Sequence, residues 1–214
     1  MKPYYDEKGI TIYHTDCLPA MKEMPDNAFD LAIVDPPYGI GNPNHEPKTS
    51  NLYTGKNWNN AIPPPEYFSE LFRVSCNQIV WGSNYYTKWL PMKMGWIAWD
   101  KMIPGNPNGF SKIELAWTSF KMGDEIVRQR VYQTDKIHPT QKPVALYKWL
   151  LTKYAKPGQT ILDTHLGSGS IAIACHDYGY DLTAYEIDKE YFEAATERIE
   201  RHKAQGQLFQ AVGL

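Results

Sequence analysis

Residues 160–170 read TILDTHLGSGS, and this stretch decides the fold that the sequence predicts. Its apolar start is typical of a buried strand, and its two glycines lead into a helical segment over 170–178. Glycines let the backbone approach a ligand, and the N-terminus of a helix favours a negative group. The next strand, over 182–186, ends in Glu186, whose carboxylate is suitably spaced to accept hydrogen bonds from ribose hydroxyls. A plain strand–helix–strand unit with a tight turn is the simpler interpretation of the same residues.

A second stretch places an acid at the same kind of strand end. Residues 29–34 read FDLAIV, a buried strand, and Asp35, Pro36, Pro37 and Tyr38 follow it directly. Two consecutive prolines end the strand because neither can donate to a sheet ladder. Ligands bind at the carboxyl edge of open α/β sheets, so the acid and the ring are candidate functional groups. A proline-rich turn without a function is the alternative, since turns also favour Asp and Pro.

Strands and helices alternate along the chain, which predicts a mostly parallel sheet in a single α/β domain over residues 1–214. The expected strands are 10–14, 29–34, 78–81, 96–99, 115–120, 160–163 and 182–186. The expected helices are 19–24, 65–76, 144–154, 170–178 and 189–203. Residues 39–63 are polar and lack periodicity, which predicts a mobile loop with a function. A loose tail is expected from Gln205.

Composition restricts the class of protein. The 214 residues have a formal net charge of −2, which argues against coating nucleic acid by bulk charge but allows a local binding patch. No apolar run is long enough for a transmembrane helix, and the N-terminus lacks the apolar core of a signal peptide. Cys17, Cys76 and Cys175 form no metal or disulfide spacing, so a reducing cytoplasm is expected. The histidines show no metal pattern, and no metal is predicted.

Ordered motifs along nearly the whole chain resemble those of a known family. Residues 35–38 and the glycine turn resemble the catalytic and cofactor motifs of S-adenosylmethionine-dependent DNA amino-methyltransferases. Residues 138–143 (HPTQKP), 16–18 (DCL) and 81–86 (WGSNYY) resemble three further segments of that family. Because the catalytic motif precedes the cofactor motif, the order is that of the permuted β group, which contains adenine-N6 and cytosine-N4 enzymes. The Thr-His pair at 164–165 departs from the family's usual Pro-Phe, and His165 either replaces the phenylalanine ring or caps the turn.

The resemblance implies a Rossmann-like methyltransferase sheet, circularly permuted, with seven mostly parallel strands, one of them antiparallel. It implies S-adenosylmethionine as cofactor and DNA with a flipped adenine as substrate, and homodimers are common in this group. The cofactor-binding residues that it implies are Asp16, Thr140, Lys142, Asp163, Gly167, Ser168, Gly169, Ser170 and Glu186. A short recognition insert is expected at about residues 101–136. The candidate DNA contacts are Tyr53, Lys56, Trp58, Arg128 and Arg130.

Methyl transfer to an exocyclic amine would use each residue of the catalytic motif. The Asp35 carboxylate and the Pro36 carbonyl would accept the two N–H bonds and favour a localised lone pair, Pro37 would fix the backbone, and Tyr38 would stack on the base. The leading Asp favours adenine, because cytosine enzymes often have Ser there. Cytosine-N4, RNA and protein-amide methylation, and a non-catalytic DNA-binding module, are the alternatives. The small size suits a solitary or phage-encoded enzyme in the cytoplasm of a bacterium or an infected host.

Overall fold

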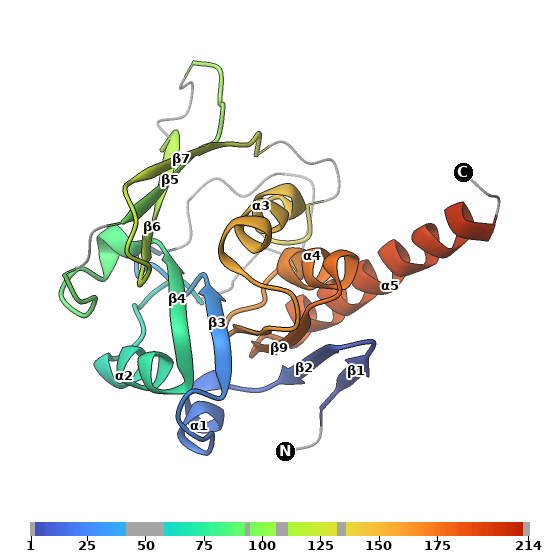
Figure 1. Ribbon diagram of the computed structural model, residues 1–214, viewed down its shortest axis with the longest axis horizontal. Helices are drawn as coiled ribbons and strands as arrows, with labels where there is room; N and C mark the ends of the chain where they lie inside the picture. Colours follow the sequence, from blue (N-terminus) through green and yellow to red (C-terminus); the bar gives the residue numbers. More distant parts are fainter. Residues whose placement is uncertain (1–2, 42–57, 93–94, 106–110, 132–135, 212–214) are drawn as a thin grey trace.

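A single mixed sheet forms the centre of the molecule (Figure 1). The computed structural model describes residues 3–41, 58–92, 95–105, 111–131 and 136–211, with side chains as far as 205. Within these ranges the sheet has nine strands in the order β1-β2-β9-β8-β3-β4-β6-β5-β7. The strands are β1 (Tyr5–Glu7), β2 (Ile10–His14), β3 (Phe29–Val34), β4 (Ser75–Trp81), β5 (Trp96–Asp100), β6 (Ile113–Thr118), β7 (Glu125–Arg128), β8 (Thr160–Asp163) and β9 (Asp181–Glu186).

Five neighbouring strands run in one direction. β2, β9, β8, β3 and β4 pair in parallel, as the alternation of strands and helices predicts. β6 is antiparallel to both of its neighbours, β4 and β5, and β1 is antiparallel to β2. β7 pairs in parallel with β5. The expectation of seven strands with one antiparallel is therefore wrong in number, since the described residues form nine strands with two antiparallel to the rest.

The two strands that the sequence missed are short strands at the two ends of the sheet. β1 has three residues and β7 has four, and all of them except Val127 are half-buried or exposed. Such segments contain no continuous apolar run, so their pairing depends on neighbouring strands rather than on local propensity. All seven expected strands are present, and β4 begins at Ser75 rather than at Gln78.

Helices cover both faces of the sheet (Figure 1). α1 (Cys17–Lys22) and α2 (Pro65–Val74) pack on one face, and α3 (Val144–Tyr154), α4 (Ser170–Tyr178) and α5 (Lys189–Ala211) pack on the other. Side chains alternate along a strand, so Ala32 and Val34 of β3 join the core under α1 and α2. Leu31 and Ile33 of the same strand join the core under α3, α4 and α5.

The helix ends show where local signals were sufficient. α3 and α4 have the expected bounds. α1 begins earlier than expected because the Asp16 carboxylate accepts the Leu18 N–H at 2.9 Å and caps the helix. α2 ends at Val74 because the chain passes directly into β4. The expected loose tail from Gln205 is wrong, because α5 continues to Ala211 through a segment without proline.

The chain leaves the parallel strands at one edge of the sheet. Asp16 follows β2, Asp35 follows β3, Gly82 follows β4, Thr164 follows β8, and Glu186 ends β9. Because parallel strands share a direction, these residues gather at the edge where open α/β sheets bind ligands.

The expected insert and loop are described only in part. Residues 101–136 contain β6 and β7, so much of the expected recognition insert is sheet, and 106–110 and 132–135 lie outside the described residues. The expected loop over 39–63 is described at its two ends, because 42–57 also lie outside. No described helix combines the length and the apolar character that crossing a membrane requires.

Candidate active site

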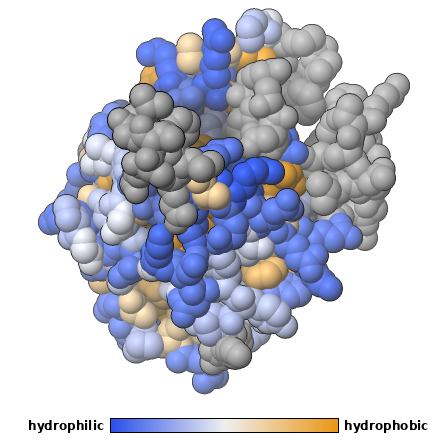
Figure 2. Space-filling view, turned by 90° about the vertical axis from the view of Figure 1, so that its right-hand side faces the viewer, coloured by the Kyte–Doolittle hydropathy of each residue, from blue (hydrophilic) through white to orange (hydrophobic). Residues whose placement is uncertain are grey.

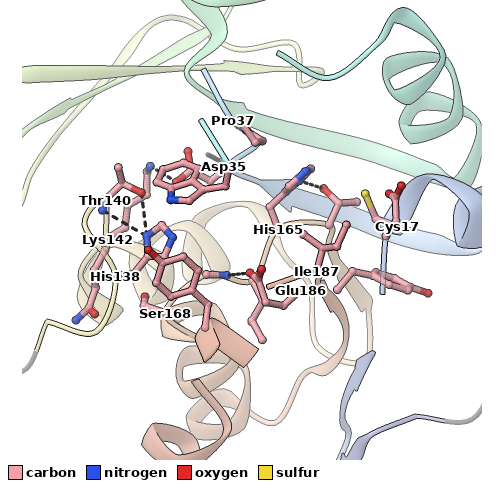
Figure 3. A pocket seen from close by; sticks show the side chains of 18 of the residues that line it. Cys17, Asp35, Pro37, His138, Thr140, Lys142, His165, Ser168, Glu186 and Ile187 are labelled. Atoms are coloured by element: carbon pink, nitrogen blue, oxygen red, sulfur yellow. Dashed lines mark hydrogen bonds and ion pairs between the residues drawn. The ribbon is translucent and has the colours of Figure 1, made fainter. Parts of the chain in front are cut away.

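A cavity of about 230 Å³ opens at the carboxyl edge of the parallel strands (Figure 3). Its wall includes Asp35 and Pro37 from the exit of β3, Gly167 from the glycine turn, and Glu186 from β9. The wall also contains other residues predicted to be functional, namely Asp16, Trp58, Thr140, Lys142 and Ser168. The remaining described candidates for the catalytic and cofactor sites, which are Pro36, Tyr38, Asp163, Gly169 and Ser170, are not part of the wall. The fold thus brings the two stretches that the sequence singled out to one cavity.

The glycine turn after β8 holds the carboxylate of Glu186. Gly167 has a φ of +54°, in the left-handed region that favours glycine. Its N–H donates to Glu186 Oε2 at 2.9 Å, and the Asp188 N–H donates to Oε1 at 2.9 Å. Burial raises the pKa of Glu186 to about 7, although these backbone hydrogen bonds lower it. A carboxylate has about four acceptor sites, so that of Glu186 can still accept a further donor in the cavity.

Three predicted cofactor residues meet α5 behind the turn. The Ser170 hydroxyl accepts from Arg198 Nη1 at 2.9 Å, and the same nitrogen donates to the Ser168 carbonyl at 2.9 Å. At Gly169 a Cβ atom would come within 3.3 Å of the Ala195 side chain. Gly169 and Ser170 therefore hold the turn against α5, and Ser168 belongs to both the turn and the cavity wall.

Asp163 is buried at the end of β8, and His165 is half-buried just beyond it. The Asp163 carboxylate accepts the His165 N–H at 3.0 Å, and burial raises the pKa of Asp163 to about 8. The His165 ring stands edge-on to Tyr67 with centroids 5.4 Å apart, and its Nδ1 lies 2.9 Å from Thr164 Oγ1. Burial lowers the pKa of His165 to about 4, so the ring is neutral. This neutral ring is part of the cavity wall.

His138 is a wall residue that the sequence did not identify as a candidate. Its ring packs edge-to-face on Tyr191 with centroids 4.3 Å apart and lies 5.0 Å from the Trp58 ring. Its Nδ1 lies 3.1 Å from Thr140 Oγ1. A Cβ atom at Gly167 would come within 3.8 Å of the imidazole, so the ring faces the glycine turn. Its position at the head of the HPTQKP segment is the signal that would have identified it.

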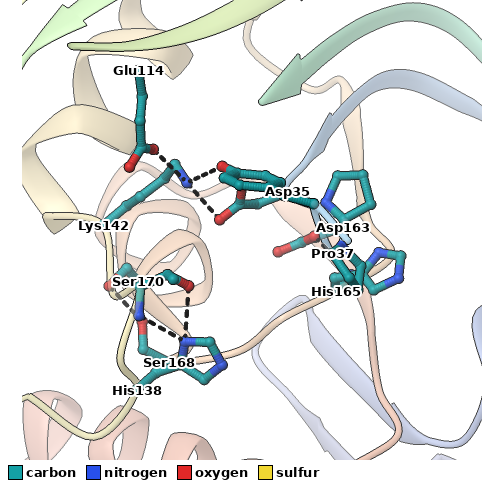
Figure 4. Close-up of polar contacts among 12 residues, drawn as sticks. Asp35, Pro37, Glu114, His138, Lys142, Asp163, His165, Ser168 and Ser170 are labelled. Atoms are coloured by element: carbon teal, nitrogen blue, oxygen red, sulfur yellow. Dashed lines mark hydrogen bonds and ion pairs between the residues drawn. The ribbon is translucent and has the colours of Figure 1, made fainter. Parts of the chain in front are cut away.

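The Asp35 carboxylate accepts a hydrogen bond on each oxygen. The Tyr38 hydroxyl donates to Oδ1 at 2.6 Å, and the Lys142 ammonium donates to Oδ2 at 2.5 Å (Figure 4). Lys142 was expected to bind the cofactor, and in the structure its ammonium contacts the Asp35–Tyr38 (DPPY) motif. The same ammonium lies 3.0 Å from Glu114 Oε2, and Glu114 Oε1 lies 2.6 Å from Lys101 Nζ. Neither Glu114 nor Lys101 belongs to a family motif, and no sequence signal points to them.

Lys142 and Glu114 support each other's charge. Burial alone would lower the pKa of Lys142, but Asp35 and Glu114 outweigh it and raise the pKa above its ordinary value. Burial alone would raise the pKa of Glu114, but Lys142 and Lys101 outweigh it and hold the pKa below its ordinary value. Both side chains are therefore charged at neutral pH. The four residues alternate in sign, and their charges sum to zero.

The segment after β4 fixes the position of Tyr38. The Tyr38 ring stacks on Tyr85 with centroids 5.0 Å apart and an interplanar angle of 15°. At Gly82, where φ is +69°, a Cβ atom would lie 2.1 Å from Tyr38 Cε1, so only glycine leaves room for the ring. The Tyr86 hydroxyl lies 2.6 Å and 2.7 Å from the carbonyl oxygens of the two prolines. A carbonyl has two lone pairs, so that of Pro36 can still accept a second hydrogen bond.

Asn59 connects the described ends of the 39–63 loop to the DPPY motif. Its Oδ1 accepts the Tyr38 N–H at 2.7 Å, and its Nδ2 donates to the Gly41 carbonyl at 2.7 Å. The side chain is buried, with the residue 2% exposed. The sequence shows only an Asn-rich loop, so nothing in it distinguishes Asn59 from its neighbours.

The candidate DNA contacts lie in different places. Tyr53 and Lys56 lie outside the described residues, and Trp58 is in the cavity wall. Arg128 is exposed on the outermost strand, β7, with its Nε 3.6 Å from Asp100 Oδ2, and Arg130 is exposed just beyond it. The two arginines therefore belong to the outer edge of the sheet and not to the cavity.

A surface cluster of His176, Asp177 and His202 is the one described group with ligand atoms close enough for a metal ion. Asp177 Oδ1 lies 2.7 Å from His202 Nε2, and Asp177 Oδ2 lies 2.7 Å from Lys148 Nζ. Ion pairs and hydrogen bonds account for these positions, and the absence of a metal stays a prediction.

Solved structures define the class of this fold. The chain is similar to the PvuII DNA methyltransferase, which is cytosine-N4-specific, with a TM-score of 0.66 and 13% identity over 94% of this chain and 93% of that one. It is similar to M1.HpyAVI, solved as a complex with S-adenosylmethionine (SAM), with a TM-score of 0.59 and 21% identity over 88% of this chain and 99% of that one. The sheet with its edge cavity is therefore a methyltransferase fold.

A family model described as DNA methylase matches residues 77–197, more than half of the chain, and the protein belongs to this N6/N4 family of DNA methyltransferases. S-adenosylmethionine is accordingly its cofactor. The chain is 27% identical to the type II methyltransferase M.HpaI of Haemophilus parainfluenzae, over 87% of this chain and 73% of that protein. It is 24% identical to the putative methylase YubD of Escherichia coli K12, over 86% of this chain and 87% of that protein.

The residues of the cavity fit this cofactor. S-adenosylmethionine presents a sulfonium cation, ribose hydroxyls and a purine ring. The carboxylates of Asp16, Asp35 and Glu186 line the cavity, and carboxylates suit both a cation and hydroxyl donors. Tyr185 and Tyr191 also line the cavity, and a purine ring can pack against their aromatic side chains.

Proposed function

We propose that this protein methylates the N6 amino group of adenine in DNA and belongs to the permuted β group of its family. The observation that supports this best is the Asp35 carboxylate, which shares one cavity with the glycine turn and Glu186. A charged acceptor suits an exocyclic amine, and aspartate in place of serine favours adenine. In chain order the strand before Asp35 precedes the strand before the glycine turn, which is the permuted order.

The cofactor-binding residues take separate parts of the ligand. When bound, S-adenosylmethionine supplies an electrophilic methyl group on its sulfonium. Glu186 accepts hydrogen bonds from the ribose hydroxyls, because its carboxylate lines the cavity and has acceptor sites beyond those that the backbone N–H groups use. Asp16 and His165 lie on the adenine side, and Thr140 with the HPTQKP segment lies at the methionine end. Asp163, Gly169 and Ser170 keep the turn in place.

Asp35 acts as a hydrogen-bond acceptor for the target amine. The lone pair of an exocyclic amine is delocalised into the ring, which makes the nitrogen a poor nucleophile. Acceptors at the Asp35 carboxylate and the Pro36 carbonyl hold its two N–H bonds, and they stabilise positive charge as it forms on the nitrogen. Once that nitrogen has gained a carbon it must lose one proton, which Asp35 takes at a carboxylate oxygen. Tyr38 orients the carboxylate through its hydroxyl and offers its ring to the base.

The target base must leave the duplex to reach this cavity, since its amino group is otherwise paired inside the helix. Trp58, in the cavity wall, contacts the strand that presents the base. Tyr53 and Lys56 are candidates for the same contact from the sequence alone. Arg128 and Arg130 contact phosphates from the outer edge of the sheet.

The proposal is tested with purified protein, labelled S-adenosylmethionine and amplified DNA that contains no modified bases. Digestion to nucleosides should yield label in N6-methyladenine. Asp35→Asn should abolish transfer while calorimetry shows that cofactor binding persists. Asp177→Asn is the matched control, because its side chain is 20% exposed against 16% for Asp35 and it lies on the far surface of α4.

Each other outcome identifies an alternative. Label in N4-methylcytosine would assign the protein to cytosine methylation, which uses the same acceptor geometry. Label confined to RNA or protein would overturn DNA as the substrate. Normal turnover by Asp35→Asn would refute the role of this carboxylate.

A further inference from the structure

We propose that Lys142 and Glu114 are positioning residues for methyl transfer: Glu114 anchors the Lys142 ammonium, and Lys142 holds the Asp35 carboxylate in its working orientation. This inference rests on the proposed role of Asp35 as the acceptor for the target amine. It assigns Lys142 to the catalytic side of the cavity rather than to the cofactor, and it adds an acid that no motif contains.

The surroundings of Lys142 show what its ammonium contacts. Three oxygen atoms surround the nitrogen, namely Asp35 Oδ2 at 2.5 Å, Glu114 Oε2 at 3.0 Å and the Tyr38 hydroxyl at 3.3 Å. The contacts to Asp35 and Tyr38 are hydrogen bonds, and the Glu114 carboxylate adds an ion pair. The side chain is 1% exposed, which leaves almost none of its surface to touch a ligand in the cavity. These contacts therefore favour a role in which Lys142 orients Asp35 over a direct contact between Lys142 and the cofactor.

Glu114 is placed to reduce the electrostatic effect of the Lys142 ammonium on the Asp35 carboxylate. An ammonium that faced Asp35 alone would direct its whole field at that carboxylate and weaken it as an acceptor. Glu114 lies on the other side of the nitrogen and divides this field between two carboxylates (Figure 4). Lys101 in turn holds Glu114 at 2.6 Å, so the far carboxylate has its own counter-charge.

The four charges come from four separate segments of the chain. Asp35 follows β3, Lys142 precedes α3, Glu114 lies on β6, and Lys101 follows β5. Their side chains are between 1% and 19% exposed, so each charge depends on its neighbours for compensation. Removing one member leaves a buried charge without a partner, whereas removing two of opposite sign keeps the balance. Paired substitutions can therefore separate a positioning role from simple loss of folding.

The test compares Lys142→Met, Glu114→Gln and the double variant. Single-turnover methyl transfer at saturating cofactor and DNA should fall about 100-fold in Lys142→Met, the scale expected for a misplaced reacting group. The cofactor Kd should stay within about threefold, because one hydrogen bond to a charged group would change it far more. The rate of methyl transfer should fall less in Glu114→Gln than in Lys142→Met. The double variant should be no slower than Lys142→Met, because Glu114 acts only through Lys142. Lys142→Arg should recover part of the rate.

Two matched variants control for the loss of a paired charge elsewhere. Lys148→Met removes an ammonium that is 2.7 Å from Asp177, on the helix that follows Lys142. Glu70→Gln removes a carboxylate that is 21% exposed, close to the 19% of Glu114, and paired with Arg73. Both should keep the wild-type rate of transfer.

Three outcomes would overturn the inference. A weaker cofactor Kd with an unchanged rate in Lys142→Met would make Lys142 a cofactor ligand. If the fold-loss of rate in the double variant equals the product of the losses in the two single variants, Glu114 and Lys142 act independently. If Lys142→Met does not fold, the balanced double variant decides, and a wild-type rate there refutes the role. Asp35→Asn is measured in the same assay. If Asp35→Asn transfers the methyl group normally, the proposed function fails. If Asp35→Asn is inactive while the Lys142 and Glu114 variants keep the wild-type rate, only the present inference fails.

Discussion

Replacing Gly82 by alanine should displace the Tyr38 ring without touching the cofactor side of the cavity. The added Cβ atom would lie 2.1 Å from Tyr38 Cε1, 2.5 Å from Cδ1 and 2.7 Å from Cζ. Carbon atoms in contact are about 3.5 Å apart, so the ring must retreat by about 1.4 Å. The bond from the Tyr38 hydroxyl to Asp35, now 2.6 Å, would lengthen to as much as about 4 Å and break.

The magnitude follows from the contacts that are lost. A hydrogen bond to a charged acceptor contributes about 1.5–3 kcal/mol, and the stack of Tyr38 on Tyr85 contributes about 0.5–1.5 kcal/mol. Alanine at a φ of +69° adds about 1–2 kcal/mol of backbone strain. The free energy of unfolding should therefore fall by about 3–6.5 kcal/mol. Methyl transfer should slow about 100-fold because the acceptor is misplaced.

Gly179→Ala isolates the backbone strain from the clash. Gly179 has a φ of +71°, and a Cβ atom there would meet nothing within 4 Å. Urea unfolding and single-turnover assays of both variants give the comparison, with cofactor Kd as the check on the cavity. Equal losses of stability in the two variants, or normal methyl transfer by Gly82→Ala, would refute the reasoning.

Two further substitutions test other parts of the site. Asp163→Asn should become more stable relative to the wild type as pH rises. The pKa of Asp163 is raised from 3.8 to about 8 in the folded protein, so the protonated carboxyl favours folding at low pH. This contribution is lost between about pH 4 and pH 8. The difference should reach at most about 6 kcal/mol. Urea unfolding of the cofactor-free protein that shows no pH trend between the two would contradict it. Tyr86→Phe should cost about 1 kcal/mol in the same assay and slow methyl transfer, because its hydroxyl holds the proline carbonyls. An unchanged rate would show that the prolines need no such anchor.

Local sequence was sufficient where a segment's own residues determine its conformation. The strand and helix around the glycine turn have the predicted bounds, because apolar runs, glycines and a helix start are all local signals. The same signals failed for β1 and β7, whose residues form strands only because a neighbouring strand offers hydrogen bonds. They failed again at the C-terminus, where α5 continues beyond the expected end at residue 203.

The class of fold, the two motifs and the family that they resemble could all be inferred from the amino-acid sequence, because each motif lies within one short segment. The surroundings of the motifs became visible only in the folded chain. The motif that contains Lys142 predicts a cofactor-binding residue, and in the structure the Lys142 ammonium contacts Asp35. Glu114, on a strand without a motif, contacts the same ammonium. The physical reason is that charges and close packing act through space. The ends of strands far apart in the chain meet at one edge of the sheet, and no local pattern records which side chains arrive there together.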